Sequence, residues 1–465
     1  MISKAGLVTL GALLCTGVSY MALVVYRHRS KINQLWITVH LLFLQKYVDQ
    51  LPPNANVQMA MKGPIYPAFF VTSSPEISAQ IAVTHNLPKT TQLESTLLPI
   101  TGGRSLIAMN GDEWKTWRGL FNPGFSSASM LENVPHIVDC VQVFCEKLKE
   151  QSGRGILCLD ELTTRLTTDV IIKVTLRLMD TYIRDELEKR FQKLKIPATD
   201  KSSQNKSVIS LVLEAYIAAQ ATEGIASAPM HLDHRFVRYA TSQIRLFLFA
   251  GNDTTSSSIV YTFHLLSKHP VALEKLRQEH NECRYTLAVI KETLRLYPPA
   301  STMREPRSGV VVTDRQNNSY PLDTLGANIV HTAVHTNPRV WPRSEAFIPE
   351  HFLVDADHEL YPNPTAYRPF EQGPRSCIGQ TLVYAEMKTV LVMTTRPFKI
   401  TPAYEEWDAL QLRNERWAKR LGRRLGVVSE HPKTVHGDRA YQTEVAGTHL
   451  ADGYPCRAEV YRPVV

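Results

Sequence analysis

The segment Phe370-Glu-Gln-Gly-Pro-Arg-Ser-Cys-Ile-Gly379 has the residue types and spacing best suited to chemistry. Cys377 comes just before residues 378–394, which we predict to form a long apolar helix. Free N–H groups and the positive dipole at a helix start favour a thiolate. A lone cysteine there is more often a buried free thiol. However, the pattern F-x-x-G-x-R-x-C-x-G fixes five positions in ten residues, so we expect Cys377 to bind a metal.

The residues around Cys377 suit a metal-bound sulfur. We expect Gly373 and Gly379 to let the backbone close around the sulfur, because a large Cβ would block that approach. Arg375 lies two residues before Cys377 and can therefore reach a carboxylate beside the metal. Phe370 offers an apolar face for packing. N–H groups aimed at the sulfur would tune its electron donation.

Glu292 and Arg295 lie three residues apart in a predicted helix over 284–297, so they share a helix face and can pair. An ordinary surface ion pair would have the same spacing and contribute little. The later segment Pro349-Glu-His-Phe352 offers His351 as a further, short candidate donor to this pair.

Asp253 and Thr254 interrupt the longest predicted helix, over 233–268. An acid and a hydroxyl are unfavourable in an apolar helix interior unless they have a function. Gly251 weakens the helix and Thr254 can bond back to a carbonyl, so we expect a small bulge. The alternative is a solvated helix face on which Asp-Thr-Thr has no role.

Trp114 and Arg118 form an i,i+4 pair on a predicted helix over 112–121. Both side chains donate hydrogen bonds and suit a carboxylate partner. The alternative is a tryptophan that covers an arginine stem. Arg304, after Pro298-Pro299, is a further candidate donor.

The Cys377 segment resembles the heme-binding signature of cytochromes P-450, and the other three motifs occur in that family's order over roughly residues 35–465. The resemblance implies heme b (iron protoporphyrin IX) with the Cys377 thiolate as axial ligand. Its cofactor-binding residues would be Cys377, Arg375, Phe370, Gly373, Gly379, Trp114, Arg118 and Arg304. Glu292 and Arg295 would be the structural pair, with Asp253 and Thr254 as catalytic proton-relay residues.

The implied activity is monooxygenation, the insertion of one atom of dioxygen into an apolar small molecule. The resemblance to filamentous-fungal members points to secondary-metabolite biosynthesis. It implies electrons from an NADPH-cytochrome P-450 reductase, with a small b-type cytochrome as a second candidate donor. Permissive apolar pocket walls are expected around residues 97–107, 246–254 and 300–303 and at Gly447-Thr-His-Leu. Substrate, pathway and oligomeric state do not follow from these residues.

Composition narrows the class of protein. The chain has 465 residues, a formal charge of +8 and a sequence pI of about 9.0. A moderate, dispersed positive charge suits binding to an acidic protein or an anionic membrane better than binding to nucleic acid. We therefore expect no nucleic-acid partner. The seven cysteines are odd in number and lack zinc spacing, which favours a reducing compartment.

Residues Ala5 to Val25 contain no charged side chain and are long enough to span a bilayer. Basic residues follow at once, which predicts a single-pass anchor with the catalytic domain in the cytosol, at the endoplasmic reticulum membrane. A cleaved signal peptide and a buried helix are the alternatives. We therefore divide the chain into 1–34, a membrane anchor with its basic flank, and 35–465, a heme-thiolate catalytic domain.

The remaining pattern predicts a mainly α protein with small β-sheets (α+β), a cytochrome P-450-like fold behind an N-terminal transmembrane helix. Further helices are expected over 75–84, 133–150, 159–178 and 180–193, and strands over 67–73, 309–313, 327–334 and 458–461. The tail over 397–465 is expected to alternate turns and short strands.

Two joins in the chain are abrupt for this family. The helix that ends near Leu176 runs into a charged segment where relatives have a lid over the substrate, and Glu279 to Glu282 runs straight into Cys283. A compact variant, skipped exons and a decaying gene are competing explanations. The alternative function is a heme-binding but catalytically impaired or truncated member, because a lost lid would open the site to water. A cofactor-free membrane scaffold is contradicted by the Cys377 loop.

Overall fold

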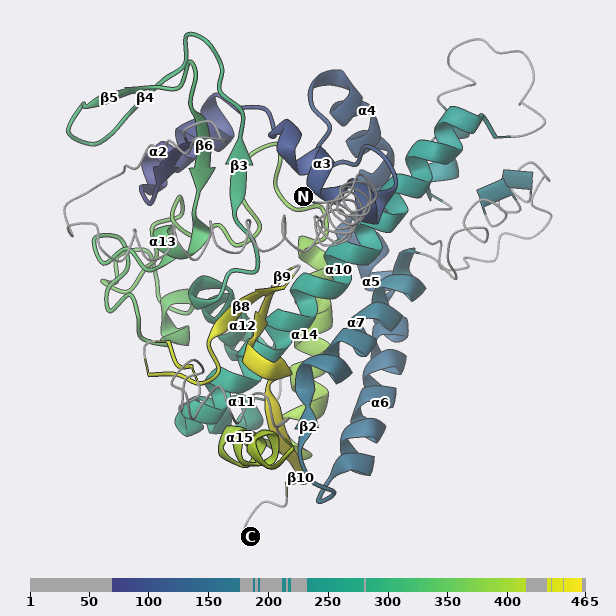
Figure 1. Cartoon of the computed structure of the whole chain (residues 1–465), viewed down its shortest axis with the longest axis vertical. Helices are drawn as coiled ribbons and strands as arrows, with labels where there is room; N and C mark the ends of the chain where they lie inside the picture. Colours follow the sequence, from purple (N-terminus) through teal and green to yellow (C-terminus); the bar gives the residue numbers. More distant parts are fainter. Residues whose placement is uncertain are drawn as a thin grey trace, which may run out of the picture. The chain divides into compact units, whose positions relative to one another are not determined.

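In the computed structural model, the described residues are 69–175, 187–188, 191–192, 211–214, 216–218, 232–279, 282–414, 433–435, 437–445 and 447–461. Helices predominate among them (Figure 1). The α-helices are α2 Pro75–Ala79, α3 Thr91–Thr101, α4 Gly111–Phe121, α5 Ser127–Glu132, α6 Val134–Gln151, α7 Leu159–Thr175, α10 His234–Lys268, α11 Pro270–Gln278, α12 Arg284–Leu296, α13 His331–His335, α14 Gln380–Thr394 and α15 Tyr404–Arg413. Short π or 3₁₀ turns are η1 Gln80–Thr84, η2 Asn122–Phe125, η3 Pro349–Phe352 and η4 Ala451–Gly453.

Helix α10 is the main support of the helical region. It begins after Asp233, whose side chain accepts a hydrogen bond from the N–H of Phe236, and it ends at His269, just before Pro270. Helices α7 and α14 pack along it, and α6 packs outside α7 (Figure 1). Their facing residues form one continuous apolar core, and its burial is the main stabilising term of this region.

The strands form small sheets that join distant parts of the chain. Parallel β1 (Phe69–Thr72) and antiparallel β3 (Thr302–Arg304) flank β6 (Gly326–Ile329). A second sheet has the order β2 (Leu157–Cys158), β10 (Pro455–Val460), β7 (Phe398–Pro402). Two hairpins pair β4 (Val311–Thr313) with β5 (Ser319–Pro321), and β8 (Gln442–Val445) with β9 (Gly447–Leu450). The mainly α prediction with small sheets is therefore confirmed.

Two element predictions were wrong. Residues 327–334 are not one strand, because β6 ends at Ile329 and α13 begins at His331. The tail contains helix α15, with Glu405 and Glu406 in its first turn, where acidic side chains favour a helix start. This helix was missed because the tail was predicted to alternate turns and short strands.

Two other predictions concern residues beyond those described. The anchor at residues 1–34, and most of the lid region between 176 and 231, lie outside the described residues. Within the described ranges, no helix is both long enough and apolar enough to cross a membrane.

Candidate functional site

The Cys377 loop lies just before α14, as predicted. The Cys377 N–H donates to the Phe370 carbonyl at 2.8 Å, which closes the loop. The side chain is exposed, although many protein atoms surround it. Desolvation raises the pKa of the Cys377 thiol, while the backbone N–H groups of Gly379 and Gln380 and the charge of Arg118 oppose that rise. The loop therefore directs donors and positive charge at one accessible sulfur.

The two loop glycines serve different purposes. Gly373 has φ +80°, and a Cβ there would lie 2.9 Å from the Ala82 carbonyl oxygen and 3.1 Å from Val83 Cγ2. It is therefore required where the loop meets η1, rather than beside the sulfur. A Cβ on Gly379 would lie 3.8 Å from Cys377 Sγ, an ordinary contact. The expectation that a Cβ at either glycine would block the backbone from the sulfur was wrong.

Phe370 and Glu371 hold the start of the loop. The Phe370 ring packs edge-on against Tyr384 of α14, with centroids 5.2 Å apart. Glu371 has φ +59° and pairs with Arg368 at 3.0 Å and His331 at 3.4 Å. Burial opposes ionisation, but these partners hold the pKa of Glu371 far below its usual value. Ion pairing thus offsets the strained backbone of Glu371, which sequence reasoning missed.

Trp114 and Arg118 of α4 both face the cysteine loop. Arg375 lies over the Trp114 ring, 4.5 Å from its centroid. Its guanidinium donates to the Met109 carbonyl at 2.7 Å. Arg118 Nη1 donates to the Ser376 carbonyl at 2.9 Å. Arg375 and Arg118 therefore tie the loop to α4 and to the segment before it.

Arg304 adds a fully buried cation to this group. Its Nη1 donates to the Leu87 carbonyl at 2.7 Å, whereas Nε and Nη2 have no hydrogen-bond partner. Desolvation and neighbouring cations lower the pKa of Lys89 to about 7 and that of Arg375 to about 9. Buried cations with unpaired N–H groups suit carboxylate ligands. Lys89 was not among the predicted residues.

Glu292 and Arg295 form a bidentate ion pair, both fully buried. Arg295 Nε and Nη2 lie 2.9 and 2.7 Å from the two Glu292 carboxylate oxygens. Arg295 also donates to the carbonyls of His335, Ser344 and Ala346. His351 Nδ1 lies 3.2 Å from Glu292 Oε2, so His351 is a third member of this buried cluster. Burial would raise the pKa of Glu292, but hydrogen bonds from His351 and Arg295 keep it below its usual value.

Helix α10 is regular through the predicted bulge. Thr254 Oγ1 donates to the Ala250 carbonyl at 2.8 Å, within an unbroken α-helix. A Cβ on Gly251 would lie 2.7 Å from Ile171 Cδ1 of α7. The predicted bulge is therefore absent, and Gly251 instead permits close packing of α7 on α10.

Asp253 has a partner that sequence reasoning did not assign. Its Oδ1 lies 2.9 Å from His449 Nε2 of β9. The other ring nitrogen, Nδ1, lies 2.8 Å from Asp160 Oδ1 in the first turn of α7. Asp160 carries no signal in the sequence that would link it to this site.

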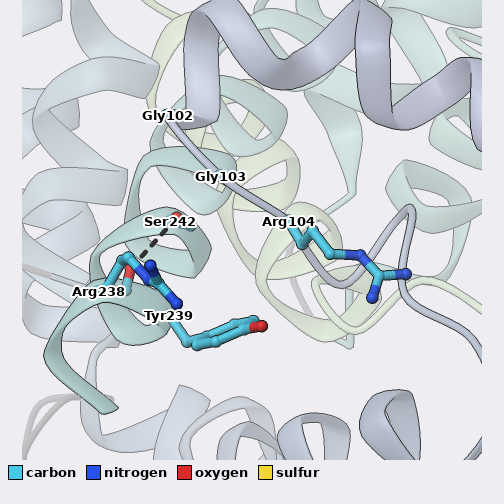
Figure 2. Close-up of a pocket in the computed structure, with 6 residues that line it drawn as sticks. All are labelled: Gly102, Gly103, Arg104, Arg238, Tyr239 and Ser242. Carbon is cyan, nitrogen blue, oxygen red and sulfur yellow. Dashed lines mark hydrogen bonds between the residues drawn. The ribbon is translucent and has the colours of Figure 1, made fainter. Parts of the chain in front are cut away.

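A pocket of about 200 Å³ opens beside the N-terminal half of α10 (Figure 2). Its lining residues are Gly102, Gly103, Arg104, Arg238, Tyr239 and Ser242. Figure 2 shows the glycine-rich loop on one side and the α10 side chains on the other, with Ser242 bonded to the Arg238 carbonyl. The pocket includes part of the predicted wall at 97–107, and two arginines, a tyrosine and a serine contribute to its lining.

Comparison with known proteins decides the family. The chain matches the family described as Cytochrome P-450 in two overlapping segments, residues 34–209 and 183–414. The chain belongs to the cytochrome P-450 family. It is therefore a cytochrome P-450 monooxygenase, an oxidoreductase, and the cofactor of the family is heme with a thiolate ligand.

Curated relatives of this P-450 include fungal proteins. It is 31% identical to the cytochrome P-450 monooxygenase polC of Polytolypa hystricis, covering 90% of this chain and 84% of polC. The monooxygenase acrF of Aspergillus aculeatus is 28% identical, covering 74% of this chain and 84% of acrF. The polC alignment runs over 493 positions, more than the 465 residues of this chain, so polC has residues without a counterpart here.

Solved structures support the fold. A crystal structure of a cytochrome P-450 (CYP102L1) has a TM-score of 0.67 and 17% identity, covering 90% of this chain and 98% of that one. A mutant heme domain of cytochrome P-450DA gives a TM-score of 0.62, also at 17% identity, covering 93% of this chain and 95% of that one. At such identities the likeness concerns the fold alone.

The residues present fit a heme. One sulfur points out from a loop rich in donors, and the buried Arg304 together with the half-buried Lys89 and Arg375 suits the two propionates of the porphyrin. The unpaired N–H groups of Arg304 are the clearest mark of this fit. The motif matches could have identified Glu371 as part of the loop, but no spacing rule pointed to Lys89, Asp160 or His449.

Proposed function

We propose that this monooxygenase inserts one oxygen atom into an apolar small molecule of fungal secondary metabolism, with Cys377 as the iron ligand. The observation that carries the proposal is the accessible Cys377 sulfur, which faces the N–H groups of Gly379 and Gln380. Bound heme activates dioxygen, and the thiolate favours O–O cleavage. One oxygen atom enters a C–H bond, and the other leaves as water with two electrons from NADPH and two protons.

The chain's own residues would hold the heme from two sides. The Phe370 carbonyl accepts the Cys377 N–H, and the Phe370 ring would supply an apolar contact to the heme. Gly373 shapes the loop where it meets η1, and Gly379 directly precedes α14. Trp114, Arg118, Arg304 and Arg375 would donate to the propionates. Glu292 and Arg295 would support the core behind them.

Asp253 and Thr254 would deliver protons to the reacting oxygen. Both lie in the middle of α10, and Asp253 is only 16% exposed in its side chain. The Thr254 hydroxyl is bonded to its own helix, so its rotation would let it pass a proton forward. This pair favours oxygen insertion over heme-thiolate isomerisation or dehydration, which need no such delivery.

The partners and location follow from family chemistry and charge. Members of the family generally need a redox partner. We propose an NADPH-cytochrome P-450 reductase docked on the Cys377 side, where positive charge assists association, with a small b-type cytochrome as a second donor. The charge-free stretch Ala5 to Val25 and the basic residues after it support a single-pass endoplasmic reticulum anchor with a cytosolic catalytic domain.

The test begins with the ligand. Reduced, CO-treated protein is expected to give an absorption band at about 450 nm, and Cys377→Ala should abolish it. Cys145→Ala, at a half-buried cysteine in α6, is the matched control and should retain the band. A Cys377→Ala spectrum identical to that of the wild type would refute the ligand assignment.

The relay is tested separately. Thr254→Ala should keep the band and NADPH consumption but raise hydrogen peroxide release by about tenfold, because protons no longer reach the oxygen efficiently. Unchanged peroxide yield would remove Thr254 from proton delivery.

A second candidate, a heme-binding but catalytically impaired member, is favoured by the join before α12. Glu282 and Cys283 both have positive φ, +59° and +50°, although neither is glycine. Such a backbone is costly and marks an unusual connection. In that case the 450 nm band would form, but reductase would drive no NADPH consumption.

A further inference from the structure

Asp160, His449 and Asp253 come from three separate elements and meet at one imidazole ring. His449 of β9 lies between the two carboxylates, with Nδ1 2.8 Å from Asp160 Oδ1 and Nε2 2.9 Å from Asp253 Oδ1. Their side chains are 18%, 14% and 16% exposed, respectively. The cluster is therefore well packed but still open to water.

The two contacts define the charge of the ring. A carboxylate only accepts hydrogen bonds, and a neutral imidazole has a single N–H. Both short contacts are therefore satisfied together only by the imidazolium form. Burial would lower the pKa of His449, but the hydrogen bonds to Asp160 and Asp253 outweigh it and raise the pKa to about 10.

We infer that His449 is a positioning residue for proton delivery: its cation orients the Asp253 carboxylate next to Thr254, and Asp160 fixes the ring. The inference rests on the proposed function. The charged groups that face the ring are Asp160 from α7 and Asp253 from α10, and the Thr443 hydroxyl of β8 donates to the His449 carbonyl. His449 thereby links the C-terminal hairpin to the centre of α10.

The placement of the cluster argues against a purely structural clamp. The Thr163 and Thr164 hydroxyls of α7 lie 2.9 and 3.0 Å from Ser256 Oγ, and Ser256 Oγ lies 3.5 Å from Asp160 Oδ1. The Ser256 hydroxyl thus reaches the Asp160 carboxylate and connects it to two further hydroxyls, while Asp253 directly precedes Thr254. A connected series of donors and acceptors that ends beside Thr254 is what proton delivery requires.

Helix α10 offers a matched control. His264 Nε2 lies 2.8 Å from Asp438 Oδ2, so it also joins the helix to an aspartate of the C-terminal region. His264 lies eleven residues beyond Asp253 and touches neither member of the relay pair. His264→Gln therefore removes a comparable histidine–aspartate contact without disturbing Asp253.

The experiment uses the full-length protein with reductase and no added substrate, so that the unknown substrate does not limit it. The measurements are peroxide released per NADPH oxidised and the solvent deuterium isotope effect on NADPH oxidation. We expect His449→Gln to raise the peroxide yield about threefold and to increase the isotope effect. His449→Lys, which keeps a cation, should restore the yield to within about twofold of the wild type, and His264→Gln should leave both readouts unchanged.

The outcomes separate the inference from the proposed function. If His449→Gln and His264→Gln behave alike while the wild type turns over, the positioning role is wrong and the proposed function stands. If the wild type gives no 450 nm band or no NADPH oxidation, both are overturned. Should His449→Gln lose its band, Asp160→Asn decides: a raised peroxide yield supports the role, and a wild-type yield rejects it.

Discussion

Two histidine–carboxylate clusters of this protein differ in their access to solvent. In the Glu292–Arg295–His351 cluster every side chain is fully buried, and Arg295 also binds three backbone carbonyls. In the Asp160–His449–Asp253 cluster each side chain keeps between 14% and 18% exposure. The first cluster binds the carbonyl of His335, whose ring accepts the N–H of Arg368 just before the cysteine loop. The second cluster lies along α10.

The difference in burial separates a cluster that supports the structure from one that can take part in proton delivery. A charge that is fully buried and fully hydrogen-bonded resists any change of protonation, because the alternative state leaves unpaired groups in a dry core. A cluster that remains within reach of water can orient a carboxylate that receives protons from the solvent. The first arrangement suits a fixed platform, and the second suits a site that must pass protons.

Arg295→Met should have the largest effect, because it leaves Glu292 as a buried charge and removes donors to three carbonyls. We expect a loss of about 3–5 kcal/mol in the free energy of unfolding, together with loss of heme. Denaturant unfolding and heme content measure this. Lys275→Met is the matched control, since the pair between Lys275 and Glu350 is half-exposed and should contribute less than about 1 kcal/mol. Equal losses of unfolding free energy in Arg295→Met and Lys275→Met would contradict the structural role of the Glu292–Arg295 pair.

Gly373→Ala tests the support of the cysteine loop where the loop meets η1. It combines a positive φ with a Cβ 2.9 Å from a backbone oxygen, so we expect a loss of about 2–3 kcal/mol. Gly379→Ala has room and an ordinary φ, and it should change stability by less than about 1 kcal/mol. Thermal unfolding of the two heme-loaded variants distinguishes them, and a larger loss for Gly379→Ala would reverse the assignment.

The cysteine loop and the Glu292–Arg295 pair were largely predictable from the sequence, whereas the partners of Asp253 were not. Phe370, Arg375 and Cys377 lie within one loop, and Glu292 and Arg295 lie on one helix turn, so local spacing encodes their contacts. Asp253 and Thr254 were found for the same reason. Strands and helices with a clear period, such as α10 and α14, were also correctly placed.

The remaining contacts depend on the tertiary fold. His449 is 196 residues from Asp253 and 289 from Asp160, and only the packing of β9 and α7 on α10 brings them together. Gly251 was interpreted as weakening its helix and opening a bulge, because its close neighbour, Ile171, belongs to another helix and could not be foreseen. Propensity describes a residue within its own segment and cannot account for such contacts.

The two clusters should respond to pH in opposite directions. The pKa of Glu292 is lowered in the folded state, so its contribution is present above its ordinary value and is lost as pH falls through the folded pKa. The pKa of His449 is raised from 6.5 to about 10, so its contribution is full below 6.5 and is lost as pH rises towards 10. The difference in unfolding free energy between wild type and His449→Gln should therefore shrink steadily as the pH rises from 6.5 towards 10.

Urea unfolding at a series of pH values from mildly acidic to alkaline measures this difference. His264→Gln is again the control: the pKa of its partner Asp438 is lowered, because hydrogen bonds from His264 and Lys268 outweigh the opposing effect of burial. The stability of that pair should therefore fall on the acid side. A constant gap between wild type and His449→Gln up to alkaline pH would mean that the ring is not charged in the folded protein.

The smallest predicted effect concerns the distance between α7 and α10, which carry Asp160 and Asp253. Gly251→Ala places a Cβ 2.7 Å from Ile171 Cδ1, so the helices must separate slightly or Ile171 must change rotamer. The better helix propensity of alanine offsets part of this cost, and we expect a net loss of about 1 kcal/mol with a modest rise in peroxide yield. Gly119→Ala, within α4 and with open space around its Cβ, should instead stabilise by about 0.5 kcal/mol. If Gly251→Ala also stabilised the protein and left the peroxide yield unchanged, close packing of these two helices would not be what holds Asp160 and Asp253 on either side of His449.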